Sequence, residues 1–165
     1  MWILDTNVVS ELMRPEPEPR VMKWLGARPG GSLFLTSVVE AELRYGLALL
    51  PAGRRRTDLT GALEDMLDQD FAERILPFDR SAARIYAEIV SSRRKQGRPM
   101  SHFDGQIAAI ARSRDAGVAT RNETDFAGCD IAVISRRHLN CPFPKGKRRL
   151  EENRRREPGQ SRFGN

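Results

Sequence analysis

Acidic residues stand at two points where strands are expected to end. Asp5 closes the short apolar strand expected at residues 2–5, and Asn122 and Asp125 follow the strand expected at 118–120. In open parallel α/β sheets, ligands bind at the carboxyl ends of the strands. We therefore expect Asp5, Asn122 and Asp125 to lie near one edge of the sheet, although they are far apart in the chain.

Asp104 adds a carboxylate on a predominantly apolar helix face. It precedes Ile107, Ala108 and Ala111 by three, four and seven residues, which places all four side chains on one face. A buried carboxylate is costly unless it is paired or binds a metal. An acid in the first turn of a helix is also stabilised by the helix dipole, and position alone leaves both interpretations open.

Glu42 repeats this pattern on the helix expected at residues 37–50. Its helical neighbours, from Val38 to Leu49, form a largely apolar surface. Glu40 lies roughly 200° away around the helix, so the two glutamates cannot face the same site. Ser37 and Glu40 have the spacing of a capping box, which assigns Glu40 to the helix start and Glu42 to the site.

Four converging carboxylates would repel one another unless a cation lies among them. Hard oxygen ligands suit Mg²⁺ or Mn²⁺, which can activate water and stabilise charge on a phosphoryl oxygen. The sequence offers no usable Ser/His/Asp set and no glycine-rich phosphate loop. His138 and Cys141 lack two further zinc ligands. Metal-assisted phosphodiester hydrolysis is the reaction class that the residues favour.

Short apolar segments alternate with helical patterns along the chain, which predicts an α/β fold with a mostly parallel central sheet flanked by helices. The expected strands are 2–5, 33–35, 75–77, 118–120 and 131–134. The expected helices are 8–13, 21–27, 37–50, 54–71, 79–94 (or from 81) and 101–115.

Length and composition indicate one globular domain. The chain has 165 residues, 39% hydrophobic and 30% charged, and no apolar run long enough to span a membrane. Its first residues lack the features of a secretion signal, so we expect a cytoplasmic protein. Residues 145–165 hold eight basic and three acidic residues, a net +5 of the total +6. We expect a basic, poorly ordered extension at 140–165.

Four blocks of the sequence resemble a known family. Residues 3–7 (ILDTN), 41–46 (AELRYG), 104–109 (DGQIAA) and 119–126 (ATRNETDF) are similar to motifs of the PIN-domain ribonucleases, in the same order. The resemblance is to toxins of the VapC type, in the FitB-like subgroup, and covers residues 2–139. It implies a PIN-like three-layer sandwich and a nuclease domain at 1–139.

The resemblance also implies roles and partners. Asp5, Glu42, Asp104 and Asp125 would be the catalytic acids that hold Mg²⁺ or Mn²⁺. Thr6, Asn7 and Asn122 would be supporting polar residues. The protein would be an endoribonuclease toxin that cleaves RNA. It would form a homodimer and be held inactive by a small cognate antitoxin, whose C-terminal segment covers the active site.

Some features leave alternatives open. Ser135-Arg136-Arg137 replaces the Asn-Pro-Trp with which relatives commonly end their last strand, and Glu123 could substitute for or supplement Asp125. One alternative function is a non-catalytic RNA-binding or regulatory module, although negative charge facing phosphates disfavours it. Another is phosphotransfer with Asp5 as nucleophile, which Asn at position 7 makes less favourable.

Overall fold

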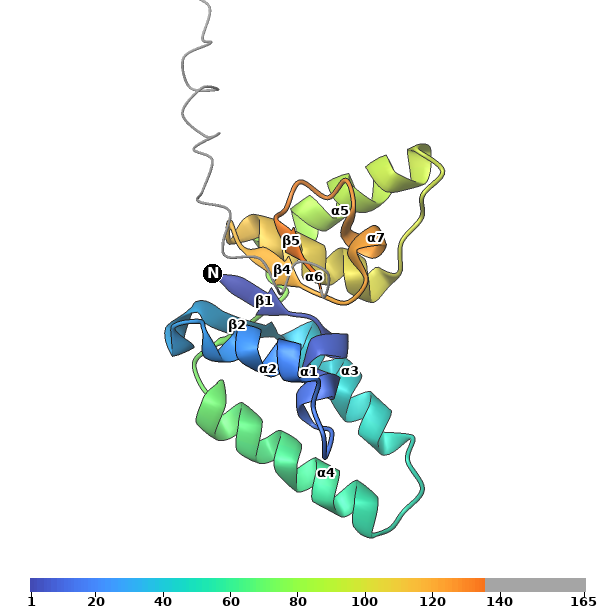
Figure 1. Cartoon of the computed structure of the whole chain (residues 1–165). Coiled ribbons are helices and arrows are strands. Elements are labelled where there is room, and N and C mark those ends of the chain that lie inside the picture. Colours follow the sequence, from blue (N-terminus) through green and yellow to red (C-terminus); the bar gives the residue numbers. More distant parts are fainter. Residues whose placement is uncertain (136–165) are drawn as a thin grey trace, which may run out of the picture.

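Five short parallel strands form the centre of the fold in the computed structural model, which describes residues 1–135 (Figure 1). The strand order is β3-β2-β1-β4-β5, so the N-terminal strand is central. The strands are β1 (Trp2–Leu4), β2 (Leu33–Thr36), β3 (Ile75–Leu76), β4 (Gly117–Ala119) and β5 (Val133–Ile134). The expected boundary at 139, the extension 140–165 and the pair His138 and Cys141 lie outside the described residues.

Helices fill the connections between these strands. They are α1 (Thr6–Leu12), α2 (Pro19–Gly26), α3 (Ser37–Ala48), α4 (Arg54–Asp65), α5 (Arg80–Lys95), α6 (His102–Ser113) and the single turn α7 (Glu123–Phe126). A 3₁₀ turn (Gly30–Ser32) precedes β2. None of the helices in residues 1–135 is both long and apolar enough to cross a lipid bilayer.

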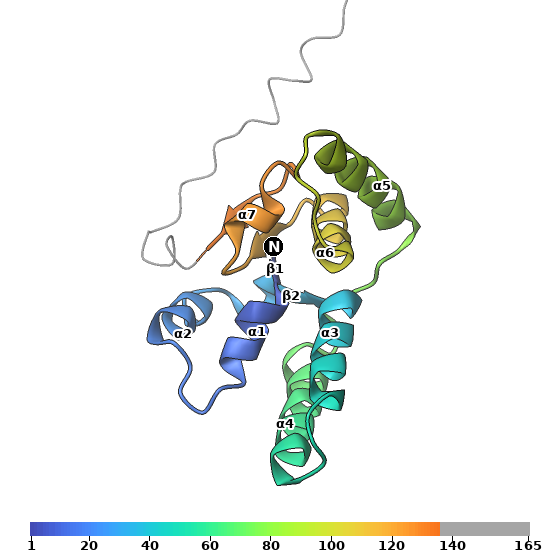
Figure 2. The same ribbon diagram turned by 90° about the vertical axis from the view of Figure 1, so that its right-hand side faces the viewer.

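The sheet is covered on both faces. Ile3 and Leu4 are neighbours on β1 and therefore point to opposite faces, yet both are fully buried. In Figure 2, α1 and α2 lie on one side of β1 and β2, and α3 lies on the other. Burial on both faces is what an all-parallel sheet requires. The α/β fold with a parallel sheet flanked by helices is confirmed.

Close packing of α5 against α6 sets the position of the Asp104 backbone. A Cβ atom added at Gly105 would lie 2.9 Å from Cε2 of Tyr86 and 2.9 Å from Cγ2 of Val90, both on α5. Only glycine allows the two helices to approach this closely without a shift. The start of α6, which carries Asp104, is thereby fixed against α5.

The capping box expected at Ser37 and Glu40 is wrong. Strand β2 runs one residue further than expected, and buried Thr36 is the N-cap of α3, with its hydroxyl accepting the N–H of Val39 at 3.1 Å. Glu40 therefore lies one position too far along the helix to close a capping box. Its carboxylate instead accepts a hydrogen bond from Nε of Arg44 at 2.8 Å.

Two further elements differ from the sequence prediction. The helix expected at 54–71 ends at Asp65 and continues as a π-helical segment, Met66–Asp70. The short helix α7 was not expected, because four residues are too few for a helical period to be recognised.

Candidate active site

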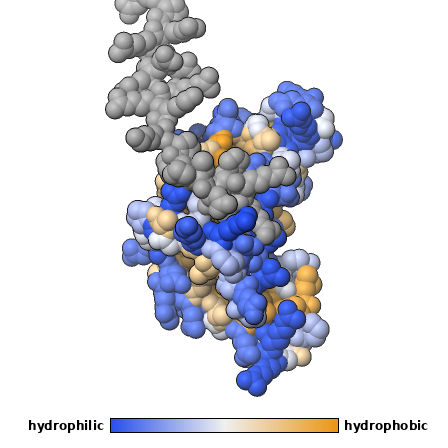
Figure 3. Space-filling model, viewed as in Figure 1, coloured by the Kyte–Doolittle hydropathy of each residue, from blue (hydrophilic) through white to orange (hydrophobic). Residues whose placement is uncertain are grey.

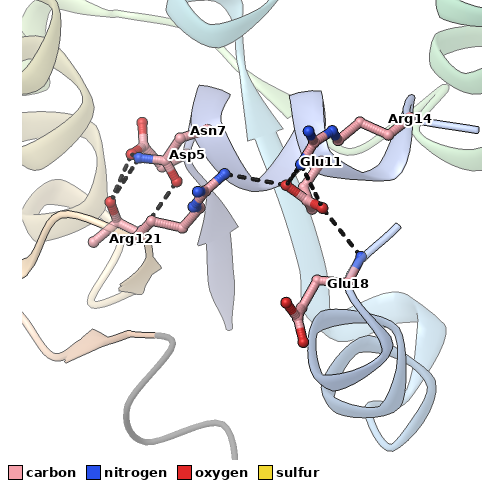
Figure 4. Close-up of polar contacts among 7 residues, drawn as sticks. Asp5, Asn7, Glu11, Arg14, Glu18 and Arg121 are labelled. Carbon is pink, nitrogen blue, oxygen red and sulfur yellow. Dashed lines mark hydrogen bonds and ion pairs between the residues drawn. The ribbon is translucent and has the colours of Figure 1, made fainter. Parts of the chain in front are cut away.

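Asp5 occupies the end of the central strand, where a dense set of donors surrounds it. Its amide donates to the carbonyl of Ala119 at 3.0 Å, and its side chain is 5% exposed. One carboxylate oxygen accepts the N–H of Thr6 at 2.8 Å. The other accepts the hydroxyl of Thr120 at 2.7 Å and the amide of Asn7 at 2.5 Å (Figure 4 shows Asn7 and Asp5). Asp5 is also the N-cap residue of α1.

Glu42 and Asp104 reach the same region from two helices. Glu42 is half-buried on α3, and its Oε2 accepts the hydroxyl of Thr6 at 2.5 Å. Asp104 is half-buried in the first turn of α6, where its Oδ2 accepts the hydroxyl of Ser101 at 2.6 Å. Helices α3 and α6 pack against each other, which brings the two carboxylates towards the end of β1.

The electrostatics of Asp5 and Glu42 indicate that the acidic side chains lie close together. Burial raises the pKa of Asp5 to about 6, and repulsion from Asp104 and Glu42 adds to the rise, against hydrogen bonds from Thr120 and Thr6. Burial also raises the pKa of Glu42, and repulsion from Asp104 adds to it, against the Thr6 hydrogen bond. Asp104 thus acts electrostatically on both Asp5 and Glu42, as a like charge does at a site that lacks its counter-charge.

Asp125 is joined to this cluster indirectly. It lies on α7, and its carboxylate accepts a hydrogen bond from the side-chain amide of Asn122. The backbone amide of Asn122 in turn donates to the hydroxyl of Thr120 at 3.0 Å, and Thr120 donates to Asp5. The charges that perturb Asp5 and Glu42 do not include Asp125. The structure therefore places Asp125 at the same strand edge but one hydrogen-bond chain away from Asp5.

The acidic side chains are of the type that binds a divalent cation, although their present orientations do not form a complete set of metal ligands. Within residues 1–135, no three His, Cys, Asp or Glu side chains are arranged to hold a metal ion as they stand. Hydroxyl donors occupy the carboxylates instead: Thr120 at Asp5, Thr6 at Glu42 and Ser101 at Asp104. The donor set is made of oxygen, as Mg²⁺ and Mn²⁺ prefer. Thr6 engages Oε2 of Glu42 and Ser101 engages Oδ2 of Asp104, so the second oxygen of each acid can ligate while these contacts persist.

A groove of about 1040 Å³ leads away from the cluster. Thr6 and Glu42 stand at one end of it, Leu43, Leu47 and Leu59 line its apolar part, and Arg54 and Arg55 add positive charge. The remaining lining residues are Ser10, Met13, Arg14, Pro15, Gly46 and Asp58. In Figure 3, apolar surface lies beside strongly hydrophilic surface in the lower part of the molecule, where α3 and α4 lie. The groove offers an apolar surface with basic residues for an extended partner.

Two site residues were missed in the sequence. Thr120 is 2% exposed and contacts Asp5, Asn7 and Asn122 through one hydroxyl. Its position at the end of a buried strand was the available signal, because a buried hydroxyl there must find partners. Ser101 is the N-cap of α6 and holds Asp104 through its hydroxyl. Its spacing of three from an acid was the signal for that contact.

Comparison with known proteins identifies the relatives of this chain. Residues 2–130 match the family model of the PIN domain. The chain is 43% identical over 135 residues to VapC ribonuclease Y4jK of Sinorhizobium fredii, covering 82% of this chain and 96% of the relative. It is 42% identical over 138 residues to toxin FitB of Neisseria gonorrhoeae, covering 84% of this chain and 99% of the relative.

A solved structure agrees with these sequence relatives. A chain in the structure of FitAB bound to an IR36 DNA fragment superposes on this protein with a TM-score of 0.77 and 41% identity. The match covers 82% of this chain and 94% of that chain. The similarity therefore extends over nearly the whole length of the relatives.

Proposed function

The chain belongs to the PIN-domain family, within its VapC and FitB branch, and on that premise we propose that it is an endoribonuclease toxin that requires Mg²⁺ or Mn²⁺. The observation that carries the proposal is the convergence of Asp5, Glu42 and Asp104 at the carboxyl end of a parallel sheet, where Asp104 acts electrostatically on the other two acids. Core packing gives no reason to collect three negative charges there. A bound cation does.

Asp5, Glu42 and Asp104 would hold the cation, and Asp125 would complete the acidic set from the α7 side. Bound there, Mg²⁺ would act as a Lewis acid that activates water and stabilises negative charge on a phosphoryl oxygen. Thr120 and Asn7 hold one oxygen of Asp5 in a fixed direction, at 2.7 and 2.5 Å. Thr6 holds Glu42 in the same way, so two carboxylates are oriented before RNA binds.

The groove supports an antitoxin partner. The relative FitB is named a toxin, and the similar solved structure is of FitAB bound to DNA. We therefore expect a cognate partner for this chain as well. We propose that a C-terminal segment of a small antitoxin lies along the groove, with apolar side chains on Leu43, Leu47 and Leu59. Arg54 and Arg55 favour acidic residues in that segment. Homodimer formation and a cytoplasmic location stay predictions from the sequence.

A cleavage assay with purified protein tests the activity. We expect cleavage of a bulk RNA substrate in Mg²⁺, loss of cleavage in EDTA, and loss on Asp104→Asn with the fold retained. Undiminished cleavage in EDTA would contradict the metal requirement. RNA binding without any cleavage, with or without metal, would favour the non-catalytic alternative. Growth arrest on expression, relieved by a co-expressed partner, tests the toxin role separately.

A further inference from the structure

An ion-pair cluster around a buried glutamate lies one helical turn from the site. Glu11 of α1 is 5% exposed, and its carboxylate accepts Nη1 of Arg121 at 3.1 Å, Nη1 of Arg14 at 3.1 Å and the N–H of Glu18 at 3.1 Å. Burial acts to raise the pKa of Glu11, but the amide of Glu18 and the two guanidinium groups outweigh it and lower the pKa below its usual value. Glu11 is therefore a charged anchor inside the protein (Figure 4).

Arg121 connects this anchor to the site. Asn7 and Glu11 lie four residues apart and share one face of α1. Arg121 contacts both, since its guanidinium donates to Glu11 and its backbone N–H donates to Oδ1 of Asn7 at 3.0 Å. The two contacts form a clamp between α1 and the segment that follows β4 (Figure 4).

The clamp determines the direction of the Asn7 amide. Because a backbone N–H must face the carbonyl oxygen of Asn7, the NH₂ group has to point the other way. It points at Asp5, where it donates to Oδ2 at 2.5 Å, and at Thr120, whose hydroxyl lies at 3.1 Å. An Asn7 side chain turned over would set its carbonyl oxygen against the Asp5 carboxylate.

We propose that Glu11 and Arg121 are positioning residues of the metal site, acting through Asn7 on the orientation of Asp5. This inference rests on the proposed function, because it assumes that Asp5 binds the cation. Neither residue is proposed to contact the cation or to be a catalytic residue. Removing an outer partner of a metal ligand typically weakens metal binding about 10- to 100-fold.

Arg14 provides a matched control within the same cluster. Arg14 and Arg121 both place Nη1 at 3.1 Å from Oε2 of Glu11, and both side chains are partly exposed. Within residues 1–135, the hydrogen bonds and ion pair of the Arg14 side chain go to Glu11 and not to Asn7, Asp5 or Thr120. Arg14→Gln and Arg121→Gln therefore remove the same charge from Glu11, but only the second loosens the clamp.

The test measures binding of Mn²⁺ alone to the full chain, by calorimetry in the absence of RNA. Removing a positive charge near the carboxylates strengthens cation binding by electrostatics alone. The clamp predicts the opposite sign for Arg121→Gln: a dissociation constant about tenfold higher. We expect Arg14→Gln to stay within about twofold of wild type. Arg121→Lys should keep most of the affinity, because a single donor contacts Glu11.

Two results would overturn the clamp, and a third result tests the metal site itself. Unchanged or tighter Mn²⁺ binding in Arg121→Gln, with thermal unfolding showing a folded protein, would overturn the clamp. Equal weakening by Arg14→Gln and Arg121→Gln would also overturn it, because that is what general loosening of the cluster produces. Asp5→Ala separates the two proposals. If wild type binds Mn²⁺ and Asp5→Ala binds equally well, the proposed metal site itself is wrong.

Discussion

The buried Asp5 carboxylate should make the metal-free protein less stable to unfolding as the pH rises. The pKa of this group rises from 3.8 to about 6 on folding, mainly because burial disfavours the charged form. A raised carboxyl pKa means that the folded state binds the proton more tightly than the unfolded state. Its contribution is favourable below the unfolded pKa and is lost as pH rises through 3.8 to about 6.

The magnitude follows from the size of the shift. A shift of about two pKa units corresponds to a loss of roughly 3 kcal/mol once both states are ionised. Between about pH 4.5 and about pH 8, roughly 2 kcal/mol of this loss should be observed. For a chain of 165 residues, this corresponds to a change of about 6 °C in Tm.

The assay compares wild type with Asp5→Ala in EDTA by thermal and urea unfolding. Titrating groups distant from the site affect both proteins equally, so the difference between them reports Asp5 together with its interaction with Glu42 and Asp104. Wild type should lose about 2 kcal/mol relative to the variant across this pH range. Mg²⁺ should then restore stability to wild type above pH 6 and leave the variant unaffected. A difference that is constant with pH, or that grows in favour of wild type, would refute the reasoning.

Three further predictions concern the neighbours of Asp5. Thr6→Val removes the hydroxyl that orients Glu42, so RNA cleavage should fall about tenfold with little change in Tm. Unchanged cleavage would show that Glu42 does not need this hydrogen bond. Gly105→Ala places a methyl group 2.9 Å from two α5 side chains, so the free energy of unfolding measured in urea should fall by about 1–3 kcal/mol. An unchanged free energy of unfolding would mean that α5 and α6 can move apart without cost. Asp125→Asn should lower cleavage about tenfold and Asp104→Asn about 100-fold or more, because Asp104 acts electrostatically on Asp5 and Asp125 does not. Equal losses would place Asp125 in direct contact with the cation.

The fold was predictable because its signals are local and repetitive. Short apolar segments such as 2–4 and 117–119, separated by helical patterns, are sufficient to indicate a parallel sheet covered on both faces. The start of α3 was not predicted correctly, because Ser37 and Thr36 are both good caps and only the length of β2 decides between them. That length depends on pairing with β3, which is a tertiary contact.

The site could be predicted only in part for the same reason. Helical phase placed Glu42 and Asp104 on apolar helix faces, since it depends on residues within two turns, and the resemblance added their assignment to the site. The roles of Thr120 and Arg121 depend on contacts with α1 across more than 100 residues of chain, which no local pattern reveals. The resemblance placed Asp125 with the other acids, whereas the structure links it to Asp5 only through Asn122 and Thr120.

The central claim is that Asp5, Glu42 and Asp104 share one divalent cation. Anomalous diffraction from crystals of the protein soaked in Mn²⁺ tests it most directly. We expect a peak among these three carboxylates in the wild type and no such peak in Asp104→Asn. A peak elsewhere, or none at a Mn²⁺ concentration that supports cleavage, would contradict it.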